Sequence, residues 1–576
     1  RIYTVRVEGY DMSLSILKRF LLLLLAVVNQ SNVRVCDGAR ILAFFPHPLM
    51  SHQLVYRPVI EALGHRGHHV TYVSGFDWKT DHPNVEHRML DLSFISKLRN
   101  KIFDFSLEEI DARTSPFAYY FGFLTAPLNE AAMLISQNVV RDPVVQQLIR
   151  SDEKFDLVMT EAFDGYEHFT AFAHKFNATS VVFLARGDSS WANEMSGFTD
   201  NPTYMVDFKS PYNTKMSRMK RFHNSVILHA TRFHGYRFLV QSQAFVDKFF
   251  DYPGWETRPP ISQLVFDQAL VLVNSHHSVG YAYPRAPHVK EVGGVSIQQP
   301  KALPRKIRNF VEDAEHGVIY FSLGNYIDFS SPFKEEIRNV FLEVFSKRKE
   351  RILWKWSGEG LDQKPENIMF SRWLPQPDIL AHSKTKLFIS HGGLMSLMEA
   401  VNFGVPVVGV VMGEDSRKNL LVAKETGYAL DIDFRYVTVE KLNDIIDEVI
   451  NNPQYKEKAL DVSSLFKDRL LKPVDEAVYW IEYVLRHGKV LQPESINMPY
   501  VELHSWDLSI MAGLIALTLV LLLVLFIGII IAGLVLILER KSPSANSPFY
   551  LEDATTTPPS VGILIFWSTE KSSVAE

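Results

Sequence analysis

The stretch WLPQPDILAHSKTKLFISHGGLMSLMEAVNFGVPVVGVVMGEDSRKN, from Trp373 to Asn419, determines how the rest of the chain is interpreted. Residues 386–390 (KLFIS) form a short apolar run of the kind found in buried strands. His391-Gly392-Gly393 follows directly, and an amphipathic helix is expected to continue to Phe403. A strand that turns through glycine into a helix binds phosphate, because the first N–H groups of the helix are unpaired and its dipole is positive there.

Side chains of the same 47-residue segment can contact the remaining parts of a nucleotide-linked sugar. Trp373 offers a flat face for a base, and Gln376 offers donors and an acceptor for the edge of that base. Glu399, two turns into the expected helix, can accept hydrogen bonds from ribose hydroxyls, and His391 can donate one to a phosphate. The alternative is an ordinary strand–helix–strand unit with a glycine-capped turn.

These residues at these spacings resemble the donor-binding signature of the UDP-glycosyltransferase family, the membrane-bound glucuronosyl- and glucosyltransferases. The matching pieces are WLPQ, FISHGG, Glu-Ala-(x)3-Gly-x-Pro over 399–406, and the segment from Asp415 to Asn419. The resemblance implies a UDP-sugar co-substrate and no permanently bound cofactor. The donor-site residues that follow from the signature and from the strand that opens the second half are Ser322, Gly324, Asn325, Trp373, Gln376, His391, Gly392, Gly393, Ser396, Glu399, Asp415 and Ser416.

Length and composition limit the class of protein. A chain of 576 residues is too long for one core, so two domains and further segments are expected. A hydrophobic content of 47% indicates a globular or membrane-attached chain, and a net charge of -5 argues against a nucleic-acid partner. The single cysteine, Cys36, excludes an intrachain disulfide and a cysteine metal cluster.

Residues 12–38 are interpreted as a signal peptide that starts at Met12. Lys18-Arg19 precedes the apolar run 20–28, and a cleavage zone ends at Gly38. A retained anchor is the alternative, but nine apolar residues are too few to span a bilayer.

Residues 508–538 contain no charged side chain and are expected to form a transmembrane helix. Arg540 and Lys541 follow this segment, so the tail 539–576 is expected on the cytosolic side. With a cleaved signal peptide, this predicts a single-pass type I protein whose catalytic domains are luminal; the resemblance implies the endoplasmic reticulum membrane. The sequon at Asn177 suits a luminal chain.

The first half opens with a strand over 41–46, a helix from His52, and a strand over 68–74. It lacks a glycine-rich phosphate loop, so this half is not expected to bind the nucleotide. His52 lies where open parallel sheets place ligands, at the carboxyl edge of the first strand. A further strand, 154–163, ends at Glu161. From position alone, His52 could be a helix cap and Glu161 a solvated side chain.

In the family, the histidine of a Ser-His pair at this place is the catalytic base, and Ser51-His52 matches that pair whereas His47 does not. Histidine suits this role because its pKa lies near the operating pH. The family places an aspartate at the end of the 154–163 strand to orient the base, and Glu161 stands there, longer by one methylene.

Strand and helix patterns alternate in both halves, which predicts two Rossmann-like parallel-sheet domains facing a cleft, the α/β arrangement called GT-B, followed by the C-terminal transmembrane helix. The acceptor-binding domain is assigned to 39–280, with 268–275 as its last strand, a linker to 281–304, and the UDP-sugar domain to 305–490. Residues 85–150 are expected to be mainly helical.

The implied reaction transfers a hexosyl group, glucuronosyl or glucosyl, to a hydroxyl of a small lipophilic acceptor, with inversion and without a metal. Asp431 and Asp433 fit the Asp-x-Asp pattern of metal-dependent transferases, but that pattern arises easily by chance. The family usually has Asn at Met395 and Gln at Ser416, so the donor sugar stays open. The alternative is a catalytically weak relative that binds UDP-sugars or lipophilic ligands. A further expectation concerns partners: the chain can form a homo-oligomer or a hetero-oligomer with related transferases.

Overall fold

The computed structural model describes residues 38–80, 82–95, 125–187, 189–324, 332–356, 365–412 and 415–540. The chain divides into two compact units, Arg1–Leu503 and His504–Glu576. The expected signal peptide up to residue 37, Asn325, and the expected tail beyond residue 540 lie outside the described residues.

The first sheet of the larger unit has seven parallel strands in the order β3-β2-β1-β4-β5-β6-β7. The strand order reverses between β1 and β4, which creates a crevice at their carboxyl ends. The strands are β1 (Arg40–Phe44), β2 (His69–Ser74), β3 (Val85–Met89), β4 (Leu157–Thr160), β5 (Thr179–Leu184), β6 (Leu270–Val273) and β7 (Val289–Glu291).

The second sheet has six parallel strands in the order β10-β9-β8-β11-β12-β13. Its order reverses between β8 and β11, so it has a crevice of the same kind. The strands are β8 (Val318–Ser322), β9 (Arg351–Lys355), β10 (Ile368–Ser371), β11 (Thr385–Ser390), β12 (Val407–Val411) and β13 (Ala429–Asp433).

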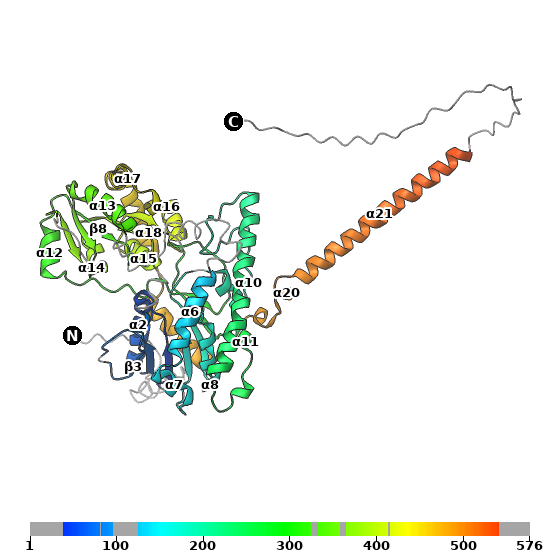
Figure 1. The fold of residues 1–576 in the computed structure, drawn as a ribbon, viewed down its shortest axis with the longest axis horizontal. Helices are drawn as coiled ribbons and strands as arrows, with labels where there is room; N and C mark the ends of the chain where they lie inside the picture. Colours follow the sequence, from blue (N-terminus) through cyan, green and yellow to red (C-terminus); the bar gives the residue numbers. More distant parts are fainter. Residues whose placement is uncertain are drawn as a thin grey trace, which may run out of the picture. The chain divides into compact units, whose positions relative to one another are not determined.

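Helices cover both faces of each sheet, so alternate residues of a strand face different cores (Figure 1). Leu42 and Phe44 of β1 face one core, and Ile41 and Ala43 face the other. With the first sheet lie α2 (Met50–His65), α6 (Thr125–Val139), α7 (Pro143–Arg150), the short 3-10 helix η1 (Glu167–Thr170), α8 (Ala171–Phe176), α9 (Ser190–Met195), α10 (Arg218–Phe249) and α11 (Ile261–Phe266). The following helices are α12 (Arg305–Glu312), α13 (Pro332–Ser346), α14 (Gln376–Leu380), α15 (Leu394–Asn402), α16 (Asp415–Thr426), α17 (Val439–Asn451), α18 (Pro453–Lys467), α19 (Pro473–His487) and α20 (Tyr500–Leu503).

Helix α19 lies in the second half of the chain but packs on the first sheet beside α2. Arg66, which follows α2, donates two hydrogen bonds of 2.8 Å to the carboxylate of Glu482 on α19. Two parallel bonds between a guanidinium and a carboxylate fix their relative orientation. The two halves of the larger unit are therefore joined by this helix as well as by the linker.

Three strands differ from the sequence predictions. β7 pairs with β6 inside the expected linker 281–304, so the segment 268–275 is not the last strand of the first sheet. β3 is a strand within residues 85–150, which were predicted to be mainly helical, and β10 was not predicted. All three are edge strands of three to five residues, too short or too polar to show a clear buried-strand pattern.

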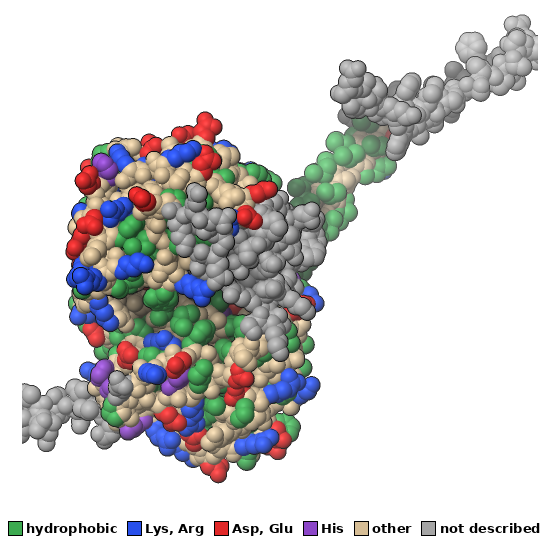
Figure 2. Space-filling model, turned by 60° about the vertical axis from the view of Figure 1, so that its left-hand side comes forward, with side chains coloured by type: hydrophobic (Ala, Val, Ile, Leu, Met, Phe, Trp, Pro, Cys, Tyr) green, Lys and Arg blue, Asp and Glu red, His purple; other side chains and the backbone are tan. Residues whose placement is uncertain are grey.

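The smaller unit contains α21 (Trp506–Arg540), a helix of 35 residues with a mean hydropathy of 3.4. Hydrophobic side chains cover much of its visible surface (Figure 2). At about 1.5 Å per residue it is longer than the hydrocarbon core of a bilayer, about 30 Å. By length and composition, α21 can cross a membrane.

His168 of η1 predicts an effect of acid on stability. Its side chain is fully buried between the rings of Phe169 and Phe245, and neither ring nitrogen has a hydrogen-bond partner. Burial lowers the pKa of His168 to about 3. Below its usual pKa of about 6.5, the unfolded chain binds a proton that the folded chain does not, so stability falls as pH falls through this window.

We expect His168→Leu to remove this penalty, which amounts to about 2 kcal/mol at pH 5. The measurement is thermal unfolding of the detergent-solubilised protein at pH 7.5 and pH 5, with the exposed His316→Leu as the control. The variant should lose less stability on acidification than the unmodified protein. If His168→Leu and the unmodified protein lost the same stability between pH 7.5 and pH 5, the acid effect could not be assigned to His168.

Candidate active site

His52 and Glu161 come from neighbouring strands of the first sheet. His52 lies in the first turn of α2, after β1, and Glu161 directly follows β4. β1 and β4 pair in parallel, with Phe44 opposite Thr160, so their carboxyl ends lie side by side. The topology therefore brings together two residues that are 109 positions apart in the chain.

The two side chains form a buried hydrogen-bonded pair. Nδ1 of His52 lies 2.8 Å from Oε1 and 2.9 Å from Oε2 of Glu161. Glu161 also accepts a hydrogen bond of 3.4 Å from the backbone N–H of Ala185, which follows β5. Because an ionised carboxylate only accepts, Nδ1 of His52 carries the proton and Nε2 keeps its lone pair. The extra methylene of Glu161 does not prevent the contact.

Burial controls the protonation of both groups. Burial, together with the positive charge of Arg186, lowers the pKa of His52 to about 3. Burial also raises the pKa of Glu161. The imidazole of His52 is therefore neutral at physiological pH and can accept a proton at Nε2. Its pKa is well below the near-neutral value expected from the sequence, so His52 is a weaker base than expected unless the imidazolium is stabilised as it forms.

His47 stacks on His52, with ring centroids 3.8 Å apart and an angle of 11° between the ring planes. The sequence analysis set this residue aside. His47, His52 and Glu161 each place a possible metal-ligating atom within 4.8 Å of the others. The lone pairs of two parallel rings do not converge on one point, so this arrangement does not fit a metal ion.

The second sheet brings the expected phosphate-binding residues together. Ser322 ends β8 opposite Ser390, which ends β11 and precedes His391. Gly324 has a φ of +73°, and a Cβ there would lie 2.8 Å from Cε1 of His391. A Cβ on Gly393, the N-cap of α15, would lie 2.6 Å from Nε2 of His391. A side chain at either position would force the imidazole of His391 to move, and the positive φ of Gly324 also favours glycine there. Burial lowers the pKa of His391 to about 4.

Gln376, Ser396 and Glu399 form one hydrogen-bonded group. Nε2 of Gln376 donates to Oε2 of Glu399 at 2.7 Å and to Oγ of Ser396 at 3.2 Å. The hydroxyl of Tyr320 donates to Oε1 of Gln376 at 3.1 Å. The sequence analysis assigned Gln376 to the base and Glu399 to the ribose as separate groups, whereas the structure couples them.

Trp373 is 66% exposed, as a stacking surface for a base requires. The ammonium group of Lys355 lies 5.6 Å from the centre of its ring. Lys355 also acts electrostatically on Glu399 and His391. Sequence analysis missed Lys355, although it ends β9 at the carboxyl edge of the same sheet.

Asp415 links the two halves of the site. Asn419 donates to Oδ2 of Asp415 at 3.3 Å and to the carbonyl of Gly392 at 3.1 Å, which ties α16 to the glycine turn. The negative charge of Asp415 raises the pKa of both His52 and His391 against the effect of burial. The carboxylate therefore acts on a residue of each sheet.

The structure also shows where the residues that depart from the family pattern lie. Met395 packs against the core that contains α2 and α19, so its side chain serves packing between the halves. Ser416 is buried. Asp431 and Asp433 form ion pairs with Lys424 and Arg435, respectively. Asn325 lies outside the described residues.

Further contacts hold α16 against the first half. The ammonium group of Lys418 donates to the carbonyl of Val206 at 2.9 Å. The hydroxyl of Tyr281 donates to Glu425 at 2.8 Å.

Arg186, another residue that sequence analysis missed, lies two residues after β5 and forms an ion pair of 3.4 Å with Asp164.

A family described as "UDP-glucoronosyl and UDP-glucosyl transferase" matches residues 41–541. The chain belongs to this UDP-glycosyltransferase family. It is therefore a UDP-dependent glycosyltransferase, and the UDP-sugar is the co-substrate of its family. The resemblance inferred from the donor signature is confirmed.

Individual relatives agree with this assignment. The chain is 33% identical over 472 residues to "UDP-glucosyltransferase 2" of Dactylopius coccus, which covers 81% of this chain and 88% of that protein. It is 26% identical over 477 residues to "UDP-glucuronosyltransferase 2B7" of Homo sapiens, a match that covers 79% of this chain and 87% of that protein. The solved structure of glycosyltransferase VinC in complex with DTDP is similar at a TM-score of 0.51 with 15% identity, covering 78% of this chain and all of VinC. The predicted GT-B fold is confirmed.

Proposed function

We propose that this UDP-glycosyltransferase moves a glucosyl or glucuronosyl group to a hydroxyl of a small lipophilic acceptor, with inversion and without a metal. The buried pair of His52 and Glu161 carries this proposal. Nε2 of His52 takes the acceptor proton while the acceptor oxygen forms a bond to the anomeric carbon. The bond from that carbon to the diphosphate breaks, and its electron pair leaves with UDP.

The proposed roles of the other site residues follow from the charges that form during the reaction. Glu161 keeps Nδ1 of His52 protonated and stabilises the imidazolium that forms when Nε2 accepts the proton. Ser322, His391 and the N-terminus of α15 stabilise the charge on the departing UDP, and Asn325 is proposed to assist them. The electrostatic effect of Asp415 on both His52 and His391 supports a single site shared by the two sheets.

The test is UDP release by membranes that contain the full chain, with UDP-glucose, UDP-glucuronate, UDP-galactose and UDP-N-acetylglucosamine over a panel of phenols and sterols. We expect acceptor-dependent release with one of the first two donors, a β-linked product by NMR, and no loss of rate in EDTA. UDP binding without release from any donor would favour a ligand-binding relative instead.

We also propose that residues 12–38 are a cleaved signal peptide and that the catalytic unit is luminal in the endoplasmic reticulum, with α21 as the single membrane span. Asn177 supports this placement because its sequon is exposed at the end of α8. The protein expressed in animal cells should carry a glycan that Endo H removes, and Asn177→Gln should lack it. The conservative Asn201→Gln, outside any sequon, serves as the control. A glycan-free wild-type chain would contradict a luminal Asn177.

A further inference from the structure

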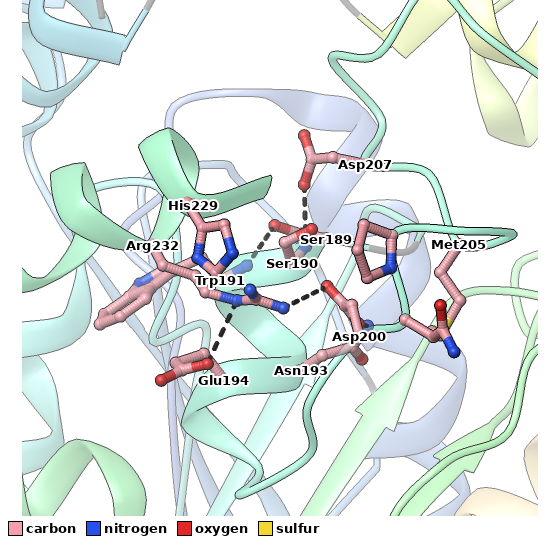
Figure 3. A network of polar contacts seen from close by, with 12 residues as sticks. Ser189, Ser190, Trp191, Asn193, Glu194, Asp200, Met205, Asp207, His229 and Arg232 are labelled. Atoms are coloured by element: carbon pink, nitrogen blue, oxygen red, sulfur yellow. Dashed lines mark hydrogen bonds and ion pairs between the residues drawn. The ribbon is translucent and has the colours of Figure 1, made fainter. Parts of the chain in front are cut away.

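Helix α10 is fixed on the protein by its inner face. That face packs on α9, α11 and η1. The buried guanidinium of Arg232 forms ion pairs with Glu194 at 3.2 Å and with Asp200 at 3.3 Å (Figure 3). Because these charges are buried together, α10 is held in one orientation, and the direction of its outer face is defined.

The outer face carries four large exposed apolar side chains, which we call the outer stripe: Met219, Phe222, Phe233 and Val240. Between 61% and 73% of each side chain is exposed. At about 100° per residue, all four fall on one side of the helix, opposite the buried positions. Single exposed apolar residues are normal on a protein surface, but a row of four on one helix indicates a binding surface.

The charges that α10 itself carries along the outer stripe are of one sign. The chain has no Asp or Glu between Asp207 and Asp247. The exposed charged residues on this part of α10 are all basic: Arg218 and Arg237 lie beside the outer stripe, and Lys220 and Arg221 lie in the first turn, about 100° around the helix from it. An apolar stripe flanked by Lys and Arg is typical of helices that lie in the interface of a membrane with anionic lipids.

Connections in the chain limit how far α10 can lie from the start of α21. The hydroxyl of Tyr500 on α20 is hydrogen-bonded to Nδ1 of His229 on α10 at 3.0 Å, and Figure 1 shows the two helices side by side. Ser495 donates a hydrogen bond of 2.6 Å to the carbonyl of Gly197, next to α9. The membrane-spanning α21 begins at Trp506, six residues after Tyr500, and six extended residues reach about 20 Å at most.

We propose that the outer stripe of α10 inserts into the surface of the lipid bilayer that α21 crosses, with the flanking basic residues on anionic headgroups. The short tether keeps α10 at a high effective concentration beside that bilayer. This contact fixes the orientation of the larger unit relative to the membrane, and it does not depend on the transfer chemistry proposed above.

The test uses the full chain in nanodiscs, with Cys36→Ser as the background. Single cysteines are introduced by Phe233→Cys or Val240→Cys and labelled with NBD. Leu465→Cys on α18 is the matched control, because Leu465 is 56% exposed. Nitroxide-labelled lipids should quench the labels at 233 and 240 by about twofold or more and leave the label at 465 unchanged.

Arg218→Glu combined with Arg237→Glu should reduce this quenching in discs that contain anionic lipid, and high salt should reduce the quenching in the protein that keeps both arginines. Quenching at 233 and 240 no greater than at 465 would overturn the proposal. A blue-shifted label that nitroxide-labelled lipid does not quench would also overturn it and would indicate a protein partner, such as a second copy of the chain.

Discussion

His52→Ala is expected to lower kcat/KM by about a thousandfold while UDP-sugar binding stays nearly unchanged. The variant removes the neutral imidazole whose Nε2 is proposed to take the acceptor proton. It also leaves Glu161 as a buried carboxylate without its partner at 2.8 Å. His52 belongs to the first sheet, whereas the proposed donor groups belong to the second sheet, so the loss should fall on the chemical step.

The measurement is steady-state transfer with the best donor and acceptor found in the panel, together with calorimetric UDP binding. His65→Ala is the matched control, because His65 is an exposed histidine at the other end of α2 and should retain full activity. A His52→Ala protein that binds UDP normally and still transfers at the wild-type rate would rule out His52 as the base. Loss of UDP binding together with activity would indicate misfolding instead.

The sequence predicts the donor half of the fold well because that half depends on local geometry. An apolar strand, the glycines of His391-Gly392-Gly393 and a helix can be recognised from neighbouring residues alone, and the structure has β11, the turn and α15 in this order. The positive φ of Gly392, +85°, is the local requirement that the glycine meets. Strands of the central part of each sheet were likewise predictable, since both of their faces are buried and their residues are apolar.

What the sequence did not predict depends on contacts between distant parts of the chain. The edge strands β3, β7 and β10 are defined by their pairing partners rather than by their own composition. The stacking of His47 on His52 follows from the path of the loop between β1 and α2. The effect of Asp415 on His52 requires the two sheets to face each other, which no local pattern contains.

The donor half of the site can be tested separately at Glu399. Glu399→Ala is expected to raise the KM and Kd for the UDP-sugar by about a hundredfold and to change kcat little. We propose that Glu399 accepts two charge-assisted hydrogen bonds from ribose hydroxyls, each of which would contribute about 1.5–3 kcal/mol before the losses of desolvation. The hydrogen bond from Gln376 at 2.7 Å holds the carboxylate in place, and Glu399→Ala also leaves that amide without its partner.

The pH dependence of donor binding should identify the same group. Burial raises the pKa of Glu399 to about 7, and the hydrogen bond from Gln376 opposes this rise. As the pH falls through 7, the free enzyme takes up a proton on Glu399, and the carboxyl group loses strength as an acceptor, so the Kd for the UDP-sugar should increase. Glu399→Gln cannot titrate and should bind weakly but with a flat pH profile, whereas the exposed Glu457→Ala should behave as the unmodified protein.

These two results separate a ribose contact from a structural role. If Glu399 only positioned Gln376, Glu399→Gln would keep a hydrogen-bonding oxygen for the amide and should restore affinity at every pH. If the carboxylate itself accepts from the ribose, Glu399→Gln should lose the charge-assisted part of the affinity above pH 7 and approach the unmodified protein below it. Because His52 lies on the other sheet, kcat should change neither with the Glu399 substitutions nor with the titration of Glu399. A fall of kcat in parallel with affinity would place Glu399 in the chemical step instead.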